Sequence, residues 1–200
     1  MKTLLQINSS MKGESSQSSK LANDLSDRIL SHSPDIKHIK RDLSKDEIPH
    51  LDEETFQSFQ DGLTDMESGV NDKLTISNDL IKELESADIL IITAPMYNFM
   101  LPSTLKSWID FVVRAGRTFQ FTEAGPESLL SNKDTYIIMT QGGMSLGTSD
   151  DFMTPYLKQI LGLIGLHNIQ FIYVKGLAMG DEIANKNIEA AYDKMVTLLG

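Results

Sequence analysis

The sequence has 200 residues, no cysteine, and 28 acidic against 18 basic side chains, which gives a formal net charge of −10. The absence of cysteine excludes disulfides, thiolate metal sites, cysteine-ligated iron–sulfur clusters and a cysteine nucleophile. The negative charge disfavours nonspecific binding of nucleic acid, because the phosphate backbone would be repelled.

The first part of the chain alternates between strand and helix patterns, read from the spacing of its apolar residues. One acidic, irregular stretch interrupts the alternation, and we interpret it as an excursion from the sheet. The expected elements are a strand at 3–8, a helix around Leu21, Leu25, Ile29 and Leu30, a strand at about 36–42, a short helix near 53–60 within the excursion at 44–70, and a helix over about 71–86.

The clearest strand lies at 87–93, where four consecutive large apolar residues indicate burial on both faces, as in the centre of a parallel sheet. Pro95 is expected to stop its ladder of hydrogen bonds. The remaining expected elements are a helix starting near Ser103 or Thr104, a strand at 135–140, a helix over about 151–164, a strand at 169–174 and a helix at 181–199.

Strand and helix alternate five times, which predicts an α/β fold: a doubly wound, five-stranded parallel sheet with helices on both faces. No repeat or low-complexity tract divides the chain, so we expect a single domain over residues 1–200. Apolar stretches are too short to span a membrane, and the N-terminus lacks a signal-peptide pattern. We therefore expect a soluble, cytoplasmic protein, and the scattered histidines indicate no metal site.

Loops after the first, third and fourth expected strands would open on one edge of the sheet, where ligands bind in open α/β folds. The first loop, at 8–19, carries many serines just before a helix, and such hydroxyl and N–H groups can hold a phosphomonoester. Helix capping explains one serine but not so many. The chain lacks G-x-x-x-x-G-K-[ST] and a G-x-G-x-x-G after the first strand, which disfavours P-loop and dinucleotide-binding sites.

The second loop, Pro95 to Phe99, places two aromatic side chains and an amide beyond a buried strand. A flat heteroaromatic ring would suit these side chains, although core or dimer contacts would explain them about as well. The third loop, Gln141-Gly142-Gly143, lets backbone approach a ligand closely, and its N–H groups could face the pyrimidine end of a flavin. A plain turn is the alternative for this glycine pair.

Together these segments resemble the FMN-dependent NADH azoreductases of bacteria, which belong to the flavodoxin-like quinone reductases. The M-Y-N-F segment preceded by Ala-Pro is the most specific element, and the resemblance covers essentially the whole chain. It implies a homodimer with two active sites at the subunit interface, each holding one non-covalent FMN. It also implies NADH-dependent, two-electron reduction of quinones and of azo bonds. The segments that carry it include Ser9-Ser10, Ser16-Gln17-Ser18, Ala94 to Phe99 and Gly142-Gly143.

The resemblance also implies a role for particular residues. No side-chain acid or base is expected, because the flavin N5 carries the chemistry, and one site serving two substrates in turn predicts ping-pong kinetics. The implied contacts are Ser10, Ser16, Gln17 and Ser18 with the phosphate and ribityl chain; Met96, Tyr97, Asn98 and Phe99 with the isoalloxazine; Gln141, Gly142 and Gly143 with its pyrimidine side, Thr140 lying nearby; and Phe119 and Phe121 with the substrate.

Two departures from the family pattern bear on substrate range. Met144-Ser145 stands where members often carry an aromatic or a histidine, and Leu163 stands where some have an aromatic that reaches the partner's site. Three alternatives remain: an electron-transfer flavodoxin, a non-catalytic flavin redox sensor, and an enzyme of this fold that uses FAD. The M-Y-N-F loop argues against the first, and a loop suited to a single phosphate argues against the last. No basic cluster marks a 2′-phosphate site, which favours NADH over NADPH.

Overall fold

The computed structural model describes residues 2–60 and 72–200. Five parallel strands form one sheet in the order β2-β1-β3-β6-β7, and β4 and β5 form a separate antiparallel hairpin. The strands are β1 (Thr3–Asn8), β2 (Lys37–Asp42), β3 (Ile89–Pro95), β4 (Phe119–Thr122), β5 (Gly125–Ser128), β6 (Asp134–Thr140) and β7 (Ile169–Val174). The predicted five-stranded parallel sheet is thereby confirmed.

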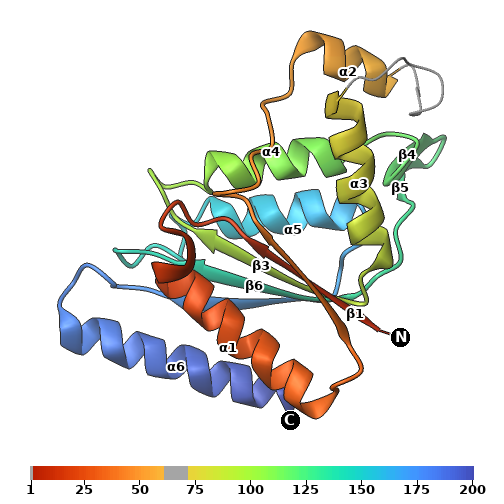
Figure 1. Cartoon of the computed structure of the whole chain (residues 1–200). Helices are drawn as coiled ribbons and strands as arrows, with labels where there is room; N and C mark the ends of the chain where they lie inside the picture. Colours follow the sequence, from red (N-terminus) through yellow and green to blue (C-terminus); the bar gives the residue numbers. More distant parts are fainter. Residues whose placement is uncertain (1, 61–71) are drawn as a thin grey trace.

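Helices cover both faces of this sheet, as predicted (Figure 1). On one face lie α1 (Gln17–His32) and α6 (Asp181–Leu199). On the other lie α3 (Asp72–Ser86), α4 (Ser103–Val112) and α5 (Met153–Leu163), with α2 (Glu53–Gln60) farther out beside α3. A short 3-10 turn, η1 (Gly13–Ser15), precedes α1. Among the described residues, no helix combines the length and hydropathy that crossing a membrane would require.

The central strands are apolar throughout because both of their faces are buried. Leu4 and Ile91 belong to the core that α1 and α6 close. Leu5, Leu90 and Ile137 belong to the core under α3, α4 and α5. All five are fully buried, and each contributes about 1.5–3 kcal/mol relative to an exposed position. Two cores, one on each face, therefore hold the sheet rigid and fix where its strands end.

As expected, β3 ends at Pro95, which forms the last pair of the ladder, with Thr140 of β6. The next N–H, that of Met96, donates to the Thr140 carbonyl at 2.8 Å. The backbone N–H groups of successive strand residues point to opposite neighbouring strands. Because the Met96 N–H points to β6, the nitrogen of Pro95 points to the β1 side. Pairing between β1 and β3 ends at Ile92, so the missing proline N–H costs no ladder bond.

The hairpin is absent from the elements expected from the sequence. Each of its strands has four residues, most of them exposed, so no alternating apolar pattern marks it. A hairpin this short is marginal by itself and depends on its contacts with the rest of the fold. The short helix expected near 53–60 is confirmed as α2, whereas residues 61–70 of the expected excursion and the first residue of the helix at 71–86 lie outside the described residues.

Candidate functional site

Four strand-end loops meet at the carboxyl edge of the sheet and line one cavity of about 430 Å³. Three of them are the loops that the sequence predicts to converge, and the fourth follows β7. β1 leads to α1 on one face and β3 leads to α4 on the other, so the cavity lies where the winding of the sheet reverses. The lining residues are Ser10, Lys12, Ser15, Ser16, Gln17, Ser18, Pro95, Met96, Tyr97, Thr140, Gln141, Gly142, Leu177 and Ala178.

The first loop presents an anion-binding helix end to the cavity. The Ser16 hydroxyl oxygen caps α1 by accepting the Ser19 N–H at 3.1 Å, and the same hydroxyl donates to the Ser19 hydroxyl at 2.8 Å. The N–H groups of Gln17 and Ser18 belong to the first turn and have no acceptor within the helix. Both residues line the cavity. This serine-rich loop can therefore cap the helix and bind an anion at the same time.

Hydrogen bonds lock the first loop to the second. Ser9 is fully buried; its N–H donates to the Thr93 hydroxyl at 2.8 Å, and its hydroxyl donates to the Thr93 carbonyl. Beyond it, the hydroxyls of Ser10 and Tyr97 lie 3.2 Å apart. Ser9 thus stabilises the fold, while Ser10 and Tyr97 present their polar groups at the cavity.

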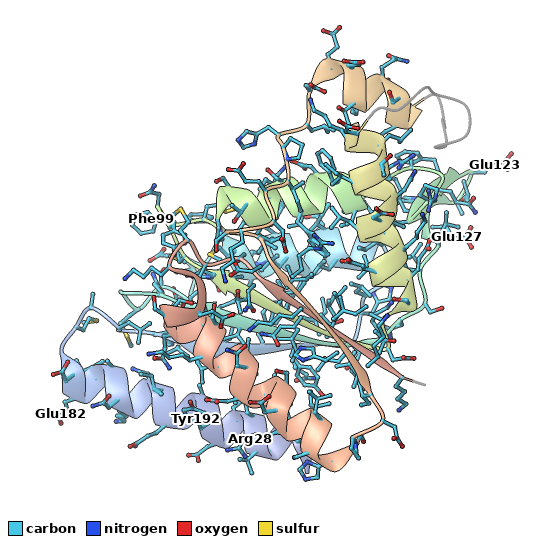
Figure 2. All side chains as sticks on the ribbon, in the orientation of Figure 1. Arg28, Phe99, Glu123, Glu127, Glu182 and Tyr192 are labelled. Carbon is cyan, nitrogen blue, oxygen red and sulfur yellow. The ribbon has the colours of Figure 1, made fainter. Side chains whose placement is uncertain are left out.

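The second loop turns sharply at Asn98 and Phe99. Tyr97 and Met100 exchange backbone hydrogen bonds of 2.8 and 3.0 Å, which leaves Asn98 and Phe99 as the two turn residues. Their φ angles are 50° and 63°, a left-handed conformation that is unfavourable for a bulky residue such as phenylalanine. Phe99 is 68% exposed and lies on the left side of the molecule in Figure 2. Neither turn residue is among those that line the cavity.

The Gln141 side chain stabilises the loop to which it belongs through hydrogen bonds. Its Nε2 donates to the Ser145 hydroxyl at 2.6 Å, and its Oε1 accepts the Leu146 N–H at 3.0 Å. The residue is 8% exposed. Its amide therefore fixes the path of residues 141–146, and this supporting role does not follow from the sequence pattern.

Gln141 and the glycine pair are joined to the loop after β7 by three backbone hydrogen bonds. Leu177 N–H donates to the Gln141 carbonyl at 3.1 Å, Ala178 N–H to the Gly142 carbonyl at 3.1 Å, and Gly176 N–H to the Gly143 carbonyl at 2.6 Å. Any Cβ at position 142 would stand 3.1 Å from the Ala178 Cβ. This close contact with Ala178 favours glycine at position 142. Both glycines are exposed, and Gly143 lies outside the cavity lining.

Five lining residues are not among the individual contacts expected from the sequence. Lys12 and Ser15 belong to the first loop, and Pro95 opens the second. Leu177 and Ala178 follow the last strand, whose carboxyl end necessarily reaches the same edge in a parallel sheet. That topological argument was available from the strand pattern and would have pointed to the loop after 174.

The two phenylalanines expected near the substrate do not line the strand-end cavity. Phe119 and Phe121 pack edge-to-face, with ring centroids 5.3 Å apart, and help to line a separate cavity of about 520 Å³ between α2, α4 and α5. Figure 2 shows Phe99 on one side of the molecule and the hairpin residue Glu123 on the other. Within a single chain, these phenylalanines therefore do not reach the strand-end cavity.

A larger cavity, of about 750 Å³, lies along α5 and β5 and includes Leu163. It shares no residue with the strand-end cavity, and it lacks the free helix N-terminus and glycine turn found there. Size alone therefore does not identify the functional site. The other departure from the family pattern, Met144, is 45% exposed beside the glycine pair.

Comparison with known proteins places this architecture in a family. The family model described as a flavodoxin-like fold matches residues 1–199. The chain belongs to this flavodoxin-like family. A relative from Pseudoalteromonas atlantica, named FMN-dependent NADH:quinone oxidoreductase, is 40% identical over 202 residues that span 100% of this chain and 98% of the relative. A relative of the same name from Vibrio vulnificus is 38% identical and spans 99% of both chains.

Solved structures agree with this flavodoxin-like fold. An azoreductase from Bacillus anthracis str. Sterne has a TM-score of 0.87 at 21% identity, covering 99% of this chain and 98% of its own. An FMN-dependent NADH-azoreductase from Bacillus anthracis str. Ames Ancestor, solved in complex with FMN, has a TM-score of 0.84 at 22% identity and covers 100% of both chains. At these identities, the likeness establishes the shared flavodoxin-like fold.

Proposed function

We propose that this chain is an FMN-dependent NADH:quinone oxidoreductase that also cleaves the azo bonds of aromatic azo compounds. The observation that carries the proposal is the convergence, on one cavity at the switch point of the sheet, of a free helix N-terminus, an aromatic strand-end loop and a close-packed glycine turn. Relatives at 40% and 38% identity that bear the name of this activity support it.

The cavity fits the phosphate and ribityl chain of FMN. The free N–H groups of Gln17 and Ser18, with the hydroxyls of Ser16 and Ser18, suit a phosphomonoester at the positive end of α1. Within the described residues, no acidic side chain lines the cavity to oppose that charge. Ser10, beside Tyr97, suits the ribityl hydroxyls. When bound, FMN supplies two-electron transfer from NADH to a quinone or an azo compound.

The second and third loops suit the isoalloxazine ring. Met96 and Tyr97 line the cavity, and the turn at Asn98 and Phe99 extends the same wall outward with an exposed aromatic side chain. Strained turns of this kind persist where the surrounding fold imposes them, and they are concentrated at functional sites. On the opposite side, Gly142 brings backbone close to where the pyrimidine end would lie. The role of these residues is to orient the ring and exclude water from one of its faces.

A homodimer is part of the proposal. Phe119 and Phe121 reach no cofactor cavity in their own chain, so a role at the substrate requires that a second copy receive them. Phe121 is 76% exposed and Phe56 is 49% exposed at the same cavity, an apolar surface suited to burial against another chain. Tyr156 and Ile160 line both this cavity and the larger one along α5, so the apolar surface is continuous. We place the enzyme in the cytoplasm, where NADH is available as donor.

Steady-state kinetics with NADH and a benzoquinone test this function. We expect NADH oxidation that depends on both FMN and the quinone, with parallel double-reciprocal lines, because one cavity serves donor and acceptor in turn. Intersecting lines, once substrate inhibition is excluded, would contradict the alternating use of one site. A flavodoxin-type carrier or a flavin sensor would show no sustained turnover with NADH and quinone alone. An FAD enzyme would be activated by FAD in preference to FMN.

A further inference from the structure

Among the described residues, a single charged side chain lines the strand-end cavity. Within residues 2–60 and 72–200, its lining includes one cationic side chain, Lys12, and no carboxylate. The chain as a whole carries a formal net charge of −10, so its general field repels an anionic ligand. Neutral serine hydroxyls and N–H groups supply the rest of the proposed phosphate subsite, and they offset this repulsion only at contact distance.

The backbone of Lys12 is fixed on both sides. Its N–H donates to the Ser10 hydroxyl at 3.3 Å, and its carbonyl accepts the Ser15 hydroxyl at 2.8 Å. Ser10 and Ser15 also line the cavity, so these bonds hold the stem of Lys12 at the rim of the phosphate-binding loop.

The ammonium group of Lys12 is not engaged elsewhere in the described part of the chain, where no ion pair involves it. The acidic residue nearest in sequence, Glu14, instead pairs with Lys40 at 2.8 Å and accepts a hydrogen bond from Asn23 at 3.1 Å. Lys12 is exposed, so its charge remains hydrated and free to turn toward a ligand.

We propose that Lys12 is the cationic contact of the FMN phosphate and the specificity-determining residue that favours FMN over riboflavin. This inference rests on the proposed function. A phosphomonoester carries about −1.5 to −2 charges at pH 7, and an ammonium–phosphate contact is stronger than a hydrogen bond between neutral groups. Lys12 acts on the phosphate and not on the ring, so its contribution is expected to depend on salt and to vanish for a ligand without phosphate.

Equilibrium binding of FMN and of riboflavin to the full chain, stripped of flavin, tests the assignment. We expect Lys12→Ala to raise the Kd for FMN about tenfold at an ionic strength of about 0.01 M and to leave the Kd for riboflavin unchanged. The ratio of variant to wild-type Kd should fall toward one at about 1 M, where the Debye length shortens to about 3 Å. Lys12→Arg, which keeps the charge, should retain most of the affinity.

Lys37→Ala is the matched control. It removes the same charge from an exposed position at the start of β2, the end of the sheet opposite the cavity, and it should leave both affinities unchanged. Equal losses for FMN and riboflavin in Lys12→Ala, or an unchanged Kd for FMN, would overturn the assignment while leaving the proposed function standing. A wild-type chain that binds neither flavin would instead refute the proposed function, and the role of Lys12 with it.

Discussion

Gly142→Val is expected to weaken FMN binding by about tenfold to a hundredfold, because overpacking costs about 1–3 kcal/mol and each 1.4 kcal/mol is a factor of ten in affinity. The Cβ alone would stand 3.1 Å from the Ala178 Cβ, and both residues line the cavity. Relief of that contact shifts Ala178 and residue 142 apart by a few tenths of an ångström, and the rest of the valine side chain adds bulk at the cavity where the flavin is expected. Titration of the flavin-free chain with FMN measures the change.

Two further variants separate this effect from general damage. Gly143→Val adds the same side chain one residue away, where a Cβ meets only the Gln141 amide, at an ordinary distance of 3.5 Å, and it should bind FMN several-fold better than Gly142→Val. Ala178→Gly, combined with Gly142→Val, removes the atom that the new Cβ meets and should restore part of the affinity. If Gly142→Val binds FMN as tightly as the wild type, the third loop has been assigned wrongly.

Asp151→Ala is expected to lower the free energy of unfolding by about 2–4 kcal/mol, the largest stability effect expected for a single polar residue near the site. Asp151 is 6% exposed. Its carboxylate accepts the N–H groups of Met153 and Thr154 at 3.0 Å each, the N–H of Gly147 at 2.8 Å and the Thr154 hydroxyl. It joins the N-terminus of α5 to the loop that follows the glycine pair, and its removal leaves four donors without this acceptor.

The stabilisation by Asp151 is expected to depend on pH with a definite sign. Burial alone would raise the pKa of Asp151, but hydrogen bonds from Thr154, Gly147 and Met153 outweigh it and hold the pKa below its ordinary value of 3.8. A carboxyl whose pKa is lower in the folded state stabilises the fold above its unfolded pKa and loses this contribution as the pH falls through the folded value.

Urea unfolding at several pH values measures this dependence. The difference between wild type and Asp151→Asn should be largest at neutral pH and shrink below about pH 3.8. Asp150→Asn is the control, since that neighbouring carboxylate is exposed and should contribute little at any pH. A difference that does not change with pH, or a cost no larger than that of the control, would show that the charge of Asp151 does not anchor the loop.

The sheet could be predicted from the sequence because its strands carry the strongest local signal. The four apolar residues of 89–92 have no periodicity, which identified a strand buried on both faces, and the structure places them at the centre of the sheet. Parallel order then fixed where the strand ends would meet, and three predicted loops converge on one cavity. The convergence of these loops follows from the topology of the sheet, and the local sequence patterns of the strands predict that topology.

Other features depend on contacts between distant segments and left no local pattern. The hairpin at 119–128 has too few buried positions to show alternation, and the inward direction of the Gln141 amide depends on partners that only the folded loop supplies. Lys12 is one of many lysines in the sequence until the fold places it beside the serines. For Phe119 and Phe121, family resemblance suggested proximity to the substrate, yet their own chain places them in another cavity.

The most direct test of the central claim is the absorption spectrum of the purified protein, recorded without oxygen before and after NADH is added, with the released cofactor identified by mass. A bound flavin that NADH bleaches, and whose mass matches FMN, is the result that the site and the relatives lead us to expect. A protein that carries no flavin, takes up no added FMN and leaves NADH unoxidised would contradict the proposed function, and the strand-end cavity would then belong to a different anionic ligand.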